Sequence, residues 1–378
     1  MPETTIPDQK EIPPMPVKPL KPQKPKQPIE KEKKKTAPAP PIEQRKCDHI
    51  RLSLSKKVES ANTDFKNVHL IHDALPELDF EEIDITTTFL GKKLNAPFII
   101  EAMTGGCKDA EKINRNLAKA ADKLGLGFGV GSQRAMVKEP ELAKTYKVRD
   151  IAPNVFLIGN LGLIQFRNGF GDKEYNDAIS GIQCDALALH LNPLQELCQP
   201  GGDKNWKGCL NELTQICKGG FPIIVKETGA GISAQTAKHI EKAGAKAIDI
   251  SGLGGTNFAL IESYREGISG FENWGIPTAC SLIEVRNAVS IPIIASGGIR
   301  SGVDMAKAIA LGADLCGAAL PFLKAATISD KAVEEKLNEF ITQLKIAMML
   351  TGSRNIAELK KAKYVLSGFV KEWKEQRR

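Results

Sequence analysis

From residue 97 onward, short apolar segments alternate with amphipathic segments long enough to form helices. The apolar segments have no polar face, which is typical of strands that are buried on both sides. The expected strands are residues 98–103, 127–132, 155–161, 185–192, 221–228, 247–254, 291–299 and 315–320. The helices that follow them are expected near residues 108–124, 139–151, 174–183, 209–218, 233–244, 278–289 and 303–312, and in a long C-terminal segment.

This order of elements predicts an α/β fold. Strands that are buried on both faces and each followed by a helix form a parallel sheet covered by helices. Eight such units within about 230 residues favour a closed (β/α)8 TIM barrel over an open doubly wound sheet. We expect residues 97–378 to form this barrel and residues 42–96 to be an N-terminal leader that packs on its mouth.

Residues 1–41 have a different composition. Proline recurs at close intervals among lysines, with few residues that could enter a core, so this segment is expected to be a disordered extension. Nine lysines against five acidic residues in residues 1–40 account for +4 of the formal charge of +7. The remainder is nearly balanced, so neither a nucleic-acid nor a membrane partner is expected, and no stretch of about 18 apolar residues suggests a membrane span.

The eight cysteines are expected to be reduced thiols. None is arranged as a CxxC or CxxH pair, and several lie inside apolar segments. Such usage favours a cytoplasmic protein over a secreted one that is held together by disulfides.

Polar residues follow the expected strands at the end where a barrel carries its active site. The fourth strand, in DALALHLNPLQE (residues 185–196), turns polar at His190, Asn192, Gln195 and Glu196. The other strands end in MTGG (103–106), SQR (132–134), Asn160, KET (226–228), SGLGGTN (251–257), SGGIRSG (296–302) and GAAL (317–320). One polar site at the barrel mouth is therefore predicted.

Three of these strand ends suggest phosphate binding. Glycines in residues 296–302 and 251–256 let backbone N–H groups approach a phosphate, and barrels often bind phosphate after strands 7 and 8. The same glycines are also compatible with plain tight turns. A nucleotide phosphate and a flavin phosphate would both suit these loops.

Several single residues are candidates for chemistry. Lys226 ends an apolar strand, so it needs an anionic partner such as a cofactor ring, a phosphate or a Schiff-base carbonyl. Glu196 suits Mg²⁺ bound with substrate phosphates, or it is a surface carboxylate. His190 could be a core imidazole, a hydrogen-bond donor to substrate or a general acid. Asn192 and Gln195 can orient groups but not exchange protons.

Cations outside the barrel strands could contact an anionic substrate. Arg45, Lys46, His49 and Arg51 lie just after the N-terminal extension, and Arg134 follows the second strand. Residues 45–51 could equally be a solvated helix start. The segment 193–206, with Pro-Gly-Gly-Asp at its centre, is either a lid over the mouth or a connecting loop.

Taken together, these motifs resemble type 2 isopentenyl-diphosphate delta-isomerase, the FMN-dependent form. The resemblance covers about residues 42–350 and rests on RKxxHI (45–50), MTGG, GSQR (131–134), IGNL (158–161), HLNPLQE (190–196), QPxGD (199–203), VKETG (225–229), SGxGGT (251–256) and SGGIRSG. In the QPxGD segment the family usually reads QPEGD, whereas this chain has Gly201-Gly202-Asp203 in place of Glu-Gly-Asp.

The resemblance implies an FMN-binding barrel that interconverts isopentenyl and dimethylallyl diphosphate by a 1,3-allylic proton shift in isoprenoid biosynthesis. It implies reduced FMN as the acid and base, NADPH as the reductant, Mg²⁺ on Glu196 and a tetrameric or octameric homo-oligomer. The implied FMN contacts are Ala102, Met103, Thr104, Ser132, Asn160, Lys226, Ser251, Thr256, Gly298, Arg300, Ala318 and Ala319. The implied substrate contacts are Arg45, Lys46, His49, Ser132, Arg134, His190, Asn192 and Gln195, and the side chains nearest to catalysis are His190, Gln195 and Lys226.

Three alternatives remain open on the sequence. An FMN-dependent 2-hydroxy-acid oxidase shares the flavin loops but expects a His base before Gly-Gly, where this chain has Leu253. An IMP dehydrogenase-like enzyme needs a nucleophilic Cys on a mobile loop, whereas Cys280 is expected at a buried helix position. A non-catalytic scaffold would use the PxxP-like spacings of the N-terminal extension to bind a partner.

Overall fold

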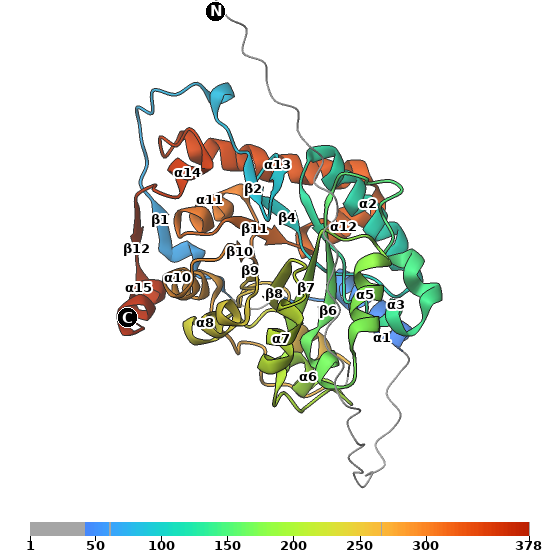
Figure 1. The fold of residues 1–378 in the computed structure, drawn as a ribbon. Coiled ribbons are helices and arrows are strands. Elements are labelled where there is room, and N and C mark those ends of the chain that lie inside the picture. Colours follow the sequence, from blue (N-terminus) through green and yellow to red (C-terminus); the bar gives the residue numbers. More distant parts are fainter. Residues whose placement is uncertain (1–41, 60–61, 266, 378) are drawn as a thin grey trace, which may run out of the picture.

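Eight parallel strands close into a barrel in the computed structural model, which describes residues 42–59, 62–265 and 267–377 (Figure 1). The predicted TIM barrel is confirmed, while the predicted extension at residues 1–41 lies outside the described residues. Around the barrel the strands follow the order β10-β11-β4-β5-β6-β7-β8-β9. Their bounds are β4 (Phe98–Ile100), β5 (Gly127–Gly129), β6 (Phe156–Gly162), β7 (Ala186–Leu191), β8 (Ile223–Glu227), β9 (Ala247–Asp249), β10 (Ile293–Ala295) and β11 (Leu315–Ala318).

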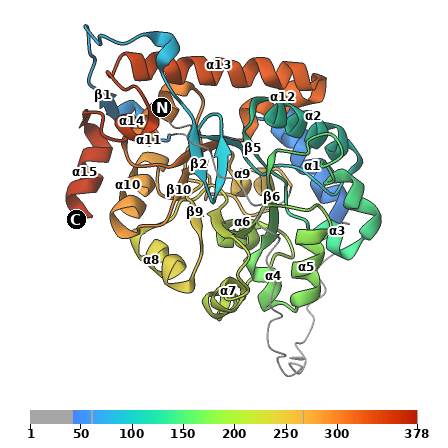
Figure 2. The ribbon, with the colours of Figure 1, turned by 45° about the horizontal axis from the view of Figure 1, so that its top comes forward.

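Helices surround the barrel, as Figure 2 shows. In α2, residues at helical spacing such as Ile113, Leu117 and Ala121 are buried, which explains why this amphipathic segment packs as a helix. The outer helices are α2 (Lys108–Leu124), α5 (Asp172–Ser180), α7 (Cys209–Cys217), α8 (Ala234–Ala243), α10 (Thr278–Ala288), α11 (Gly302–Ala310), α12 (Leu320–Ile328) and α13 (Asp330–Met349). Shorter helices in the loops are α4 (Leu163–Arg167), α6 (Pro193–Cys198) and α9 (Phe258–Ser263).

The helix predicted over residues 139–151 is wrong. The structure has instead a short helix α3 (Arg134–Lys138) and a 3-10 helix η3 (Pro140–Thr145). Glu139 between them has φ −131° and ψ 87°, outside the helical region. A residue that precedes proline is driven out of the helical region by the proline ring, so Pro140 ends α3 and starts a separate turn.

The segment before the barrel reaches both of its ends. Helix α1 (Ile42–Ser55) brings Arg45, Lys46 and His49 to the cavity at the mouth. The hairpin of β2 (Thr87–Phe89) and β3 (Lys92–Leu94) lies across the opposite end, where Phe89 and Leu94 pack against apolar side chains inside the barrel (Figure 2). The leader segment 42–96 therefore does not lie wholly at the mouth. It also contains η1 (Phe65–Asn67), β1 (Val68–Leu70) and η2 (Phe80–Glu82).

A further layer follows the last barrel helix. It consists of α14 (Ile356–Leu359), β12 (Tyr364–Leu366) and α15 (Gly368–Gln376). Strand β12 pairs antiparallel with β1, with Val68 opposite Leu366. This two-stranded sheet joins the segment before the barrel to the segment after it. All eight cysteines are free thiols. Within the described ranges, no helix is both long and apolar enough to cross a membrane.

Candidate active site

One large cavity opens at the carboxyl ends of the barrel strands. Including the open solvent at its rim, the cavity has a volume of about 1210 Å³. Almost all of the predicted site residues line this cavity, and they come from the strand ends, the loops after them and α1. Those that line it are Arg45, Lys46, His49, Ala102, Met103, Ser132, Arg134, Asn160, His190, Asn192, Gln195, Glu196, Lys226, Ser251, Thr256, Gly298, Arg300, Ala318 and Ala319.

Two predicted contacts do not line this cavity: Arg51, which is exposed and pairs with Asp48, and Thr104. Its side chain is buried, and its hydroxyl donates to Asn114 Oδ1 at 2.6 Å. Asn114 in turn donates to the backbone carbonyls of Thr104 and Thr145. Thr104 therefore fixes the turn after β4 against α2, because its hydroxyl and its carbonyl both bond to Asn114.

Two glycine-rich loops meet where a flavin phosphate is expected. A Cβ on Gly255 would lie 2.5 Å from the backbone nitrogen of Gly298, and one on Gly297, which has φ 94°, would overlap the backbone of Gly252. The loops thus pack backbone against backbone, a closeness that plain tight turns do not require. Exposed N–H groups in such loops suit a phosphate, so these residues fit FMN. Arg300 lines the cavity but its guanidinium pairs with Glu59.

Lys226 lies in a buried cluster of charges below the cavity. Its Nζ is 3.3 Å from Asp249 Oδ2 and 3.9 Å from Glu101 Oε2, and it donates to the Glu227 carbonyl at 2.7 Å. Burial acts to lower the pKa of Lys226, but Asp249 and Glu101 outweigh it and the pKa is raised. A positive charge is therefore held at the end of β8.

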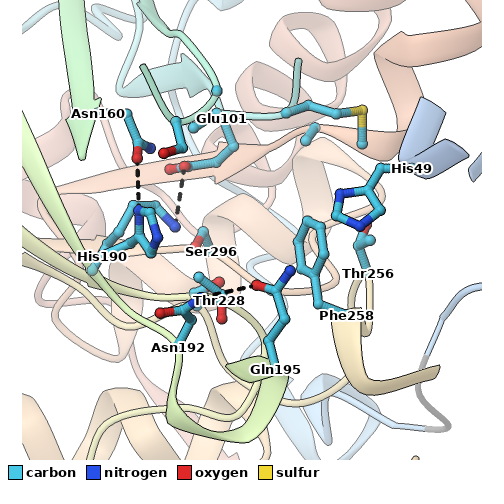
Figure 3. Close-up of a pocket in the computed structure, with 18 of the residues that line it drawn as sticks. His49, Glu101, Asn160, His190, Asn192, Gln195, Thr228, Thr256, Phe258 and Ser296 are labelled. Atoms are coloured by element: carbon cyan, nitrogen blue, oxygen red, sulfur yellow. Dashed lines mark hydrogen bonds and ion pairs between the residues drawn. The ribbon is translucent and has the colours of Figure 1, made fainter. Parts of the chain in front are cut away.

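His190 is a neutral imidazole at the end of β7. Burial, followed by the charges of Lys226, Lys46 and Arg134, lowers the pKa of His190 to about 3. Its Nδ1 lies 2.8 Å from Asn160 Oδ1, so Nδ1 carries the proton and Nε2 is left as an acceptor (Figure 3). A neutral ring held in this way can accept or orient a hydrogen bond, but it is a poor source of protons at neutral pH.

Three cations gather on the α1 side of the cavity. Burial and the neighbouring guanidiniums of Arg45 and Arg134 lower the pKa of Lys46 to about 8. No carboxylate forms an ion pair with Lys46 among the described residues, and Arg134 has only a distant one, Asp203 Oδ2 at 3.6 Å. Crowded cations with few carboxylate partners are costly to bury and create a site for a polyanion.

Glu196 and Asn192 offer oxygen atoms suited to a hard cation. The Glu196 carboxylate is buried and accepts from Asn192 Nδ2 at 3.1 Å and from the Asp203 backbone N–H at 2.8 Å. Asn192 Oδ1 is buried with no hydrogen-bond partner. No group of three or more His, Cys, Asp or Glu able to hold a metal occurs within the described chain. A Mg²⁺ site with one carboxylate and substrate phosphates fits this donor set.

A buried carboxylate that the sequence interpretation missed supports two predicted contacts. Glu262 of α9 accepts from His49 Nε2 at 2.9 Å and from Gln195 Nε2 at 3.5 Å, and it pairs with Arg265 at 2.6 Å. Burial lowers the pKa of His49 despite Glu262, so the ring is a neutral donor. Figure 3 shows His49, Phe258 and Gln195 on one side of the cavity and Asn160, His190 and Glu101 on another.

Other lining residues were not predicted individually as contacts, although several lie in the segments from which the site was predicted. They are Glu101, Gly131, Gln165, Gln199, Thr228, Phe258, Ser296, Gly297, Gly317 and Leu320. Glu101 carried a usable signal, because it is a carboxylate at the end of an apolar strand, as Lys226 is an ammonium at the end of another. None of the others is charged, and most are residue types that are also common in turns or at the start of a helix.

The segment 193–206 packs tightly onto the site. Its first part is the helix α6, and a Cβ on Gly202 would overlap the carbonyl of Glu196. Only glycine permits this approach, which brings the Asp203 N–H to the Glu196 carboxylate. The backbone after α6 thereby fixes the orientation of Glu196.

Two features bear on the alternative enzymes. Cys280 is fully buried inside α10, and burial raises the pKa of its thiol to about 12, so it is not a nucleophile on a mobile loop. After β9 the residue before Gly254-Gly255 is Leu253, which is buried. The side chain at this position cannot act as the base of a 2-hydroxy-acid oxidase.

Comparison with known proteins agrees with this geometry. A family model described as FMN-dependent dehydrogenase matches residues 190–366. Isopentenyl-diphosphate delta-isomerase of Pyrococcus furiosus is 49% identical, covering 88% of this chain and 89% of that protein. The protein of the same name from Rickettsia bellii is 47% identical, covering 84% and 96%.

Solved structures with the same fold are more distant in sequence. Lactate oxidase of Pediococcus acidilactici has a TM-score of 0.65 at 18% identity, covering 87% of this chain and 94% of that one. Mandelate oxidase has a TM-score of 0.58 at 16% identity, covering 84% and 94%. These two share the fold alone, whereas nearly half of all residues are identical to the isomerases over most of both chains. The chain therefore belongs to the FMN-dependent isopentenyl-diphosphate delta-isomerase family.

Proposed function

We propose that the cavity at the barrel mouth interconverts isopentenyl and dimethylallyl diphosphate, using bound FMN that is kept reduced by NADPH, and Mg²⁺. The observation that carries this assignment to the cavity is the pairing of two charge features within it. A cluster of three crowded cations suits a diphosphate, and the ammonium of Lys226 suits a negatively charged ring. Both features have a use in a flavin-dependent reaction of a prenyl diphosphate.

The side chains have distinct tasks in this proposal. Arg45, Lys46 and Arg134 bind the diphosphate and hold the short prenyl chain in one orientation, which lowers the entropic cost of the reaction. Neutral His190 accepts or orients a hydrogen bond beside them. Gln195 donates a hydrogen bond to Glu262 and orients the substrate from the opposite side of the cavity.

Protonation of an unactivated alkene needs a strong acid next to a surface that stabilises positive charge. His190 and His49 are neutral, since burial lowers the pKa of each. Reduced FMN, when bound, supplies the acid–base group and an electron-rich face. Lys226 would hold a positive charge near its ring, and Ala102, Met103, Ser132, Asn160, Ser251, Thr256, Gly298, Ala318 and Ala319 would enclose it.

Glu196 would bind Mg²⁺, with Asn192 Oδ1 as a second oxygen and the substrate phosphates completing the site. We further propose a cytoplasmic homo-oligomer. The free thiols support the cytoplasmic location. The tetrameric or octameric state follows from the family resemblance.

The test is an assay of purified protein with isopentenyl diphosphate, Mg²⁺ and NADPH under anaerobic conditions, followed by product analysis. We expect dimethylallyl diphosphate to form, and to form much more slowly in Glu196→Gln. A matched assay with lactate or glycolate under air tests the oxidase alternative. Oxygen uptake with a hydroxy acid, and no conversion of the prenyl diphosphate, would contradict the proposal.

A further inference from the structure

Two carboxylates and one ammonium are enclosed together at the centre of the barrel mouth. Glu101 directly follows β4, Asp249 ends β9 and Lys226 lies on β8, and both Glu101 and Lys226 line the cavity. Asp249 is 1% exposed, Lys226 7% and Glu101 8%. The cluster therefore lies almost wholly out of water, where an unbalanced charge is costly.

The Glu101 side chain occupies the space beside Gly317 on the neighbouring strand β11. A Cβ on Gly317 of β11 would overlap Glu101 Oε1 and lie 3.0 Å from its carboxyl carbon. A larger residue at 317 would displace the Glu101 side chain from its position beside the cavity. The carboxylate thus occupies a specific space in the fold.

Hydrogen bonding distinguishes the two carboxylates. Asp249 accepts from Ser296 Oγ at 2.5 Å and lies 3.3 Å from Lys226 Nζ, as expected for an ionised group. Glu101 Oε1 has no hydrogen-bond partner, and Glu101 Oε2 lies farther from Lys226 Nζ, at 3.9 Å. Two buried carboxylates beside one ammonium leave one negative charge in excess, so a proton is favoured on the less well paired of the two, Glu101.

Two other titratable groups lie near the cluster, and burial raises the pKa of one of them, Glu227, to about 7, so Glu227 ionises at a lower pH than Glu101. Glu227 on β8 accepts from the backbone N–H groups of Thr228, Gly229 and Ala230, and its carboxylate is turned to that loop. His190 on β7 is neutral. Strands β5 and β11, which flank β4 in the barrel, carry no charged side chain. With Glu101 protonated, Lys226 and Asp249 cancel.

We infer that Glu101 keeps the proton of a Glu101–Asp249 pair and is a positioning residue that sets the charge Lys226 presents to FMN. This inference rests on the proposed placement of FMN over Lys226. While Glu101 is protonated, the cluster is neutral and added negative charge on the flavin is tolerated. Once Glu101 ionises, the cluster carries one excess negative charge and opposes flavin reduction. Burial and then Asp249 raise the pKa of Glu101 to about 8, so the change falls in an accessible range.

The test is the two-electron midpoint potential of the bound FMN in the holoprotein between pH 6 and 10. Reduction adds negative charge beside Glu101 and raises its pKa, so the wild type should take up one more proton from about pH 8 upward. One additional proton changes the reduction equilibrium tenfold per pH unit, about 30 mV for a two-electron couple. Glu101→Gln cannot titrate and should lack this additional slope. The control Glu241→Gln, at a half-buried carboxylate on α8 outside the cavity, should retain it.

Infrared spectra give a second readout, whose main observation is made on the wild-type holoprotein. The wild-type holoprotein should show a protonated carboxylic acid band at pH 7 that disappears toward pH 10 and is absent in Glu101→Gln. A yellow protein without the additional slope, or a Glu101→Gln protein that keeps it, would overturn this inference while leaving the isomerase assignment intact. A protein that binds no FMN would overturn both.

Discussion

The most informative perturbation of the proposed diphosphate site is at Lys46. Its ammonium is enclosed beside Arg45 and Arg134 and has no carboxylate ion pair among the described residues. Lys46→Arg keeps the charge at every accessible pH, because a guanidinium does not lose its proton. Lys46→Met keeps most of the aliphatic length and removes the charge. The two variants separate charge from packing.

The size of the effect follows from the environment of Lys46. Lowering the pKa from 10.5 to about 8 corresponds to about 3.4 kcal/mol against the charged form in the empty cavity. A phosphate charge about 4 Å away contributes about 4 kcal/mol at an effective dielectric constant of about 20, enough to restore the proton. Above pH 8 diphosphate binding should therefore take up a proton. Each pH unit above 8 should weaken it about tenfold, or about 1.4 kcal/mol.

The assay is calorimetric titration of the holoprotein with inorganic pyrophosphate and Mg²⁺ from pH 7 to pH 9.5, in two buffers that differ in ionisation enthalpy. The wild type should lose about tenfold in affinity relative to Lys46→Arg between pH 8 and pH 9, and should take up an additional proton. Lys46→Met should bind more weakly at pH 7 and lack this proton. Because the ligand's own ionisation is common to all three proteins, parallel pH profiles for wild type and Lys46→Arg would refute the reasoning.

Three further predictions concern the metal, the phosphate loop and His190. Glu196→Gln should raise the Mg²⁺ concentration for half-maximal isomerisation by about ten- to a hundred-fold, since even residues that only support metal ligands cost that much; an unchanged Mg²⁺ dependence would show that Glu196 is not a ligand. In Gly297→Ala the new Cβ would meet the Gly252 backbone. The free energy of unfolding should therefore fall by more than the cost of backbone strain alone, which is about 1–3 kcal/mol. The variant should also release FMN on gel filtration. The control Gly91→Ala shares a positive φ but has open space around it, so it should keep FMN. His190 is neutral when folded and charged when unfolded below about pH 6.5, so the free energy of unfolding, measured with urea, should fall as the pH falls from about 6.5 toward 3. His190→Gln should flatten that part of the curve, and identical slopes would mean that burial does not hold the ring neutral.

The barrel could be predicted because its signals are local. Each strand is a short apolar segment that is followed at once by an amphipathic helix, and the closed order of eight strands repeats the order in the chain. The mouth residues could be predicted for the same reason, since in a parallel barrel the ends of all strands meet at one face. Lys226 on β8 is brought together with His190 on β7 and Glu196 just after β7 without any pairing having to be known.

What the sequence did not reveal depends on contacts between distant segments. Strand β1 pairs with β12 almost 300 residues later, and each is only three residues long. Glu262 resembles an ordinary helix-surface carboxylate until α1 places His49 against it. The role of Gly317 is visible only once Glu101 on another strand occupies the space beside it. Such features have no local pattern to identify them.

The measurement that tests the central claim most directly is isomerase activity before and after removal of the flavin. The protein is stripped of its yellow pigment, assayed anaerobically with isopentenyl diphosphate, Mg²⁺ and dithionite, and then reconstituted with FMN and assayed again. We predict no conversion without FMN and recovery of dimethylallyl diphosphate formation with reduced FMN only. Equal rates in the colourless and reconstituted protein would show that side chains alone move the proton, and would contradict the account.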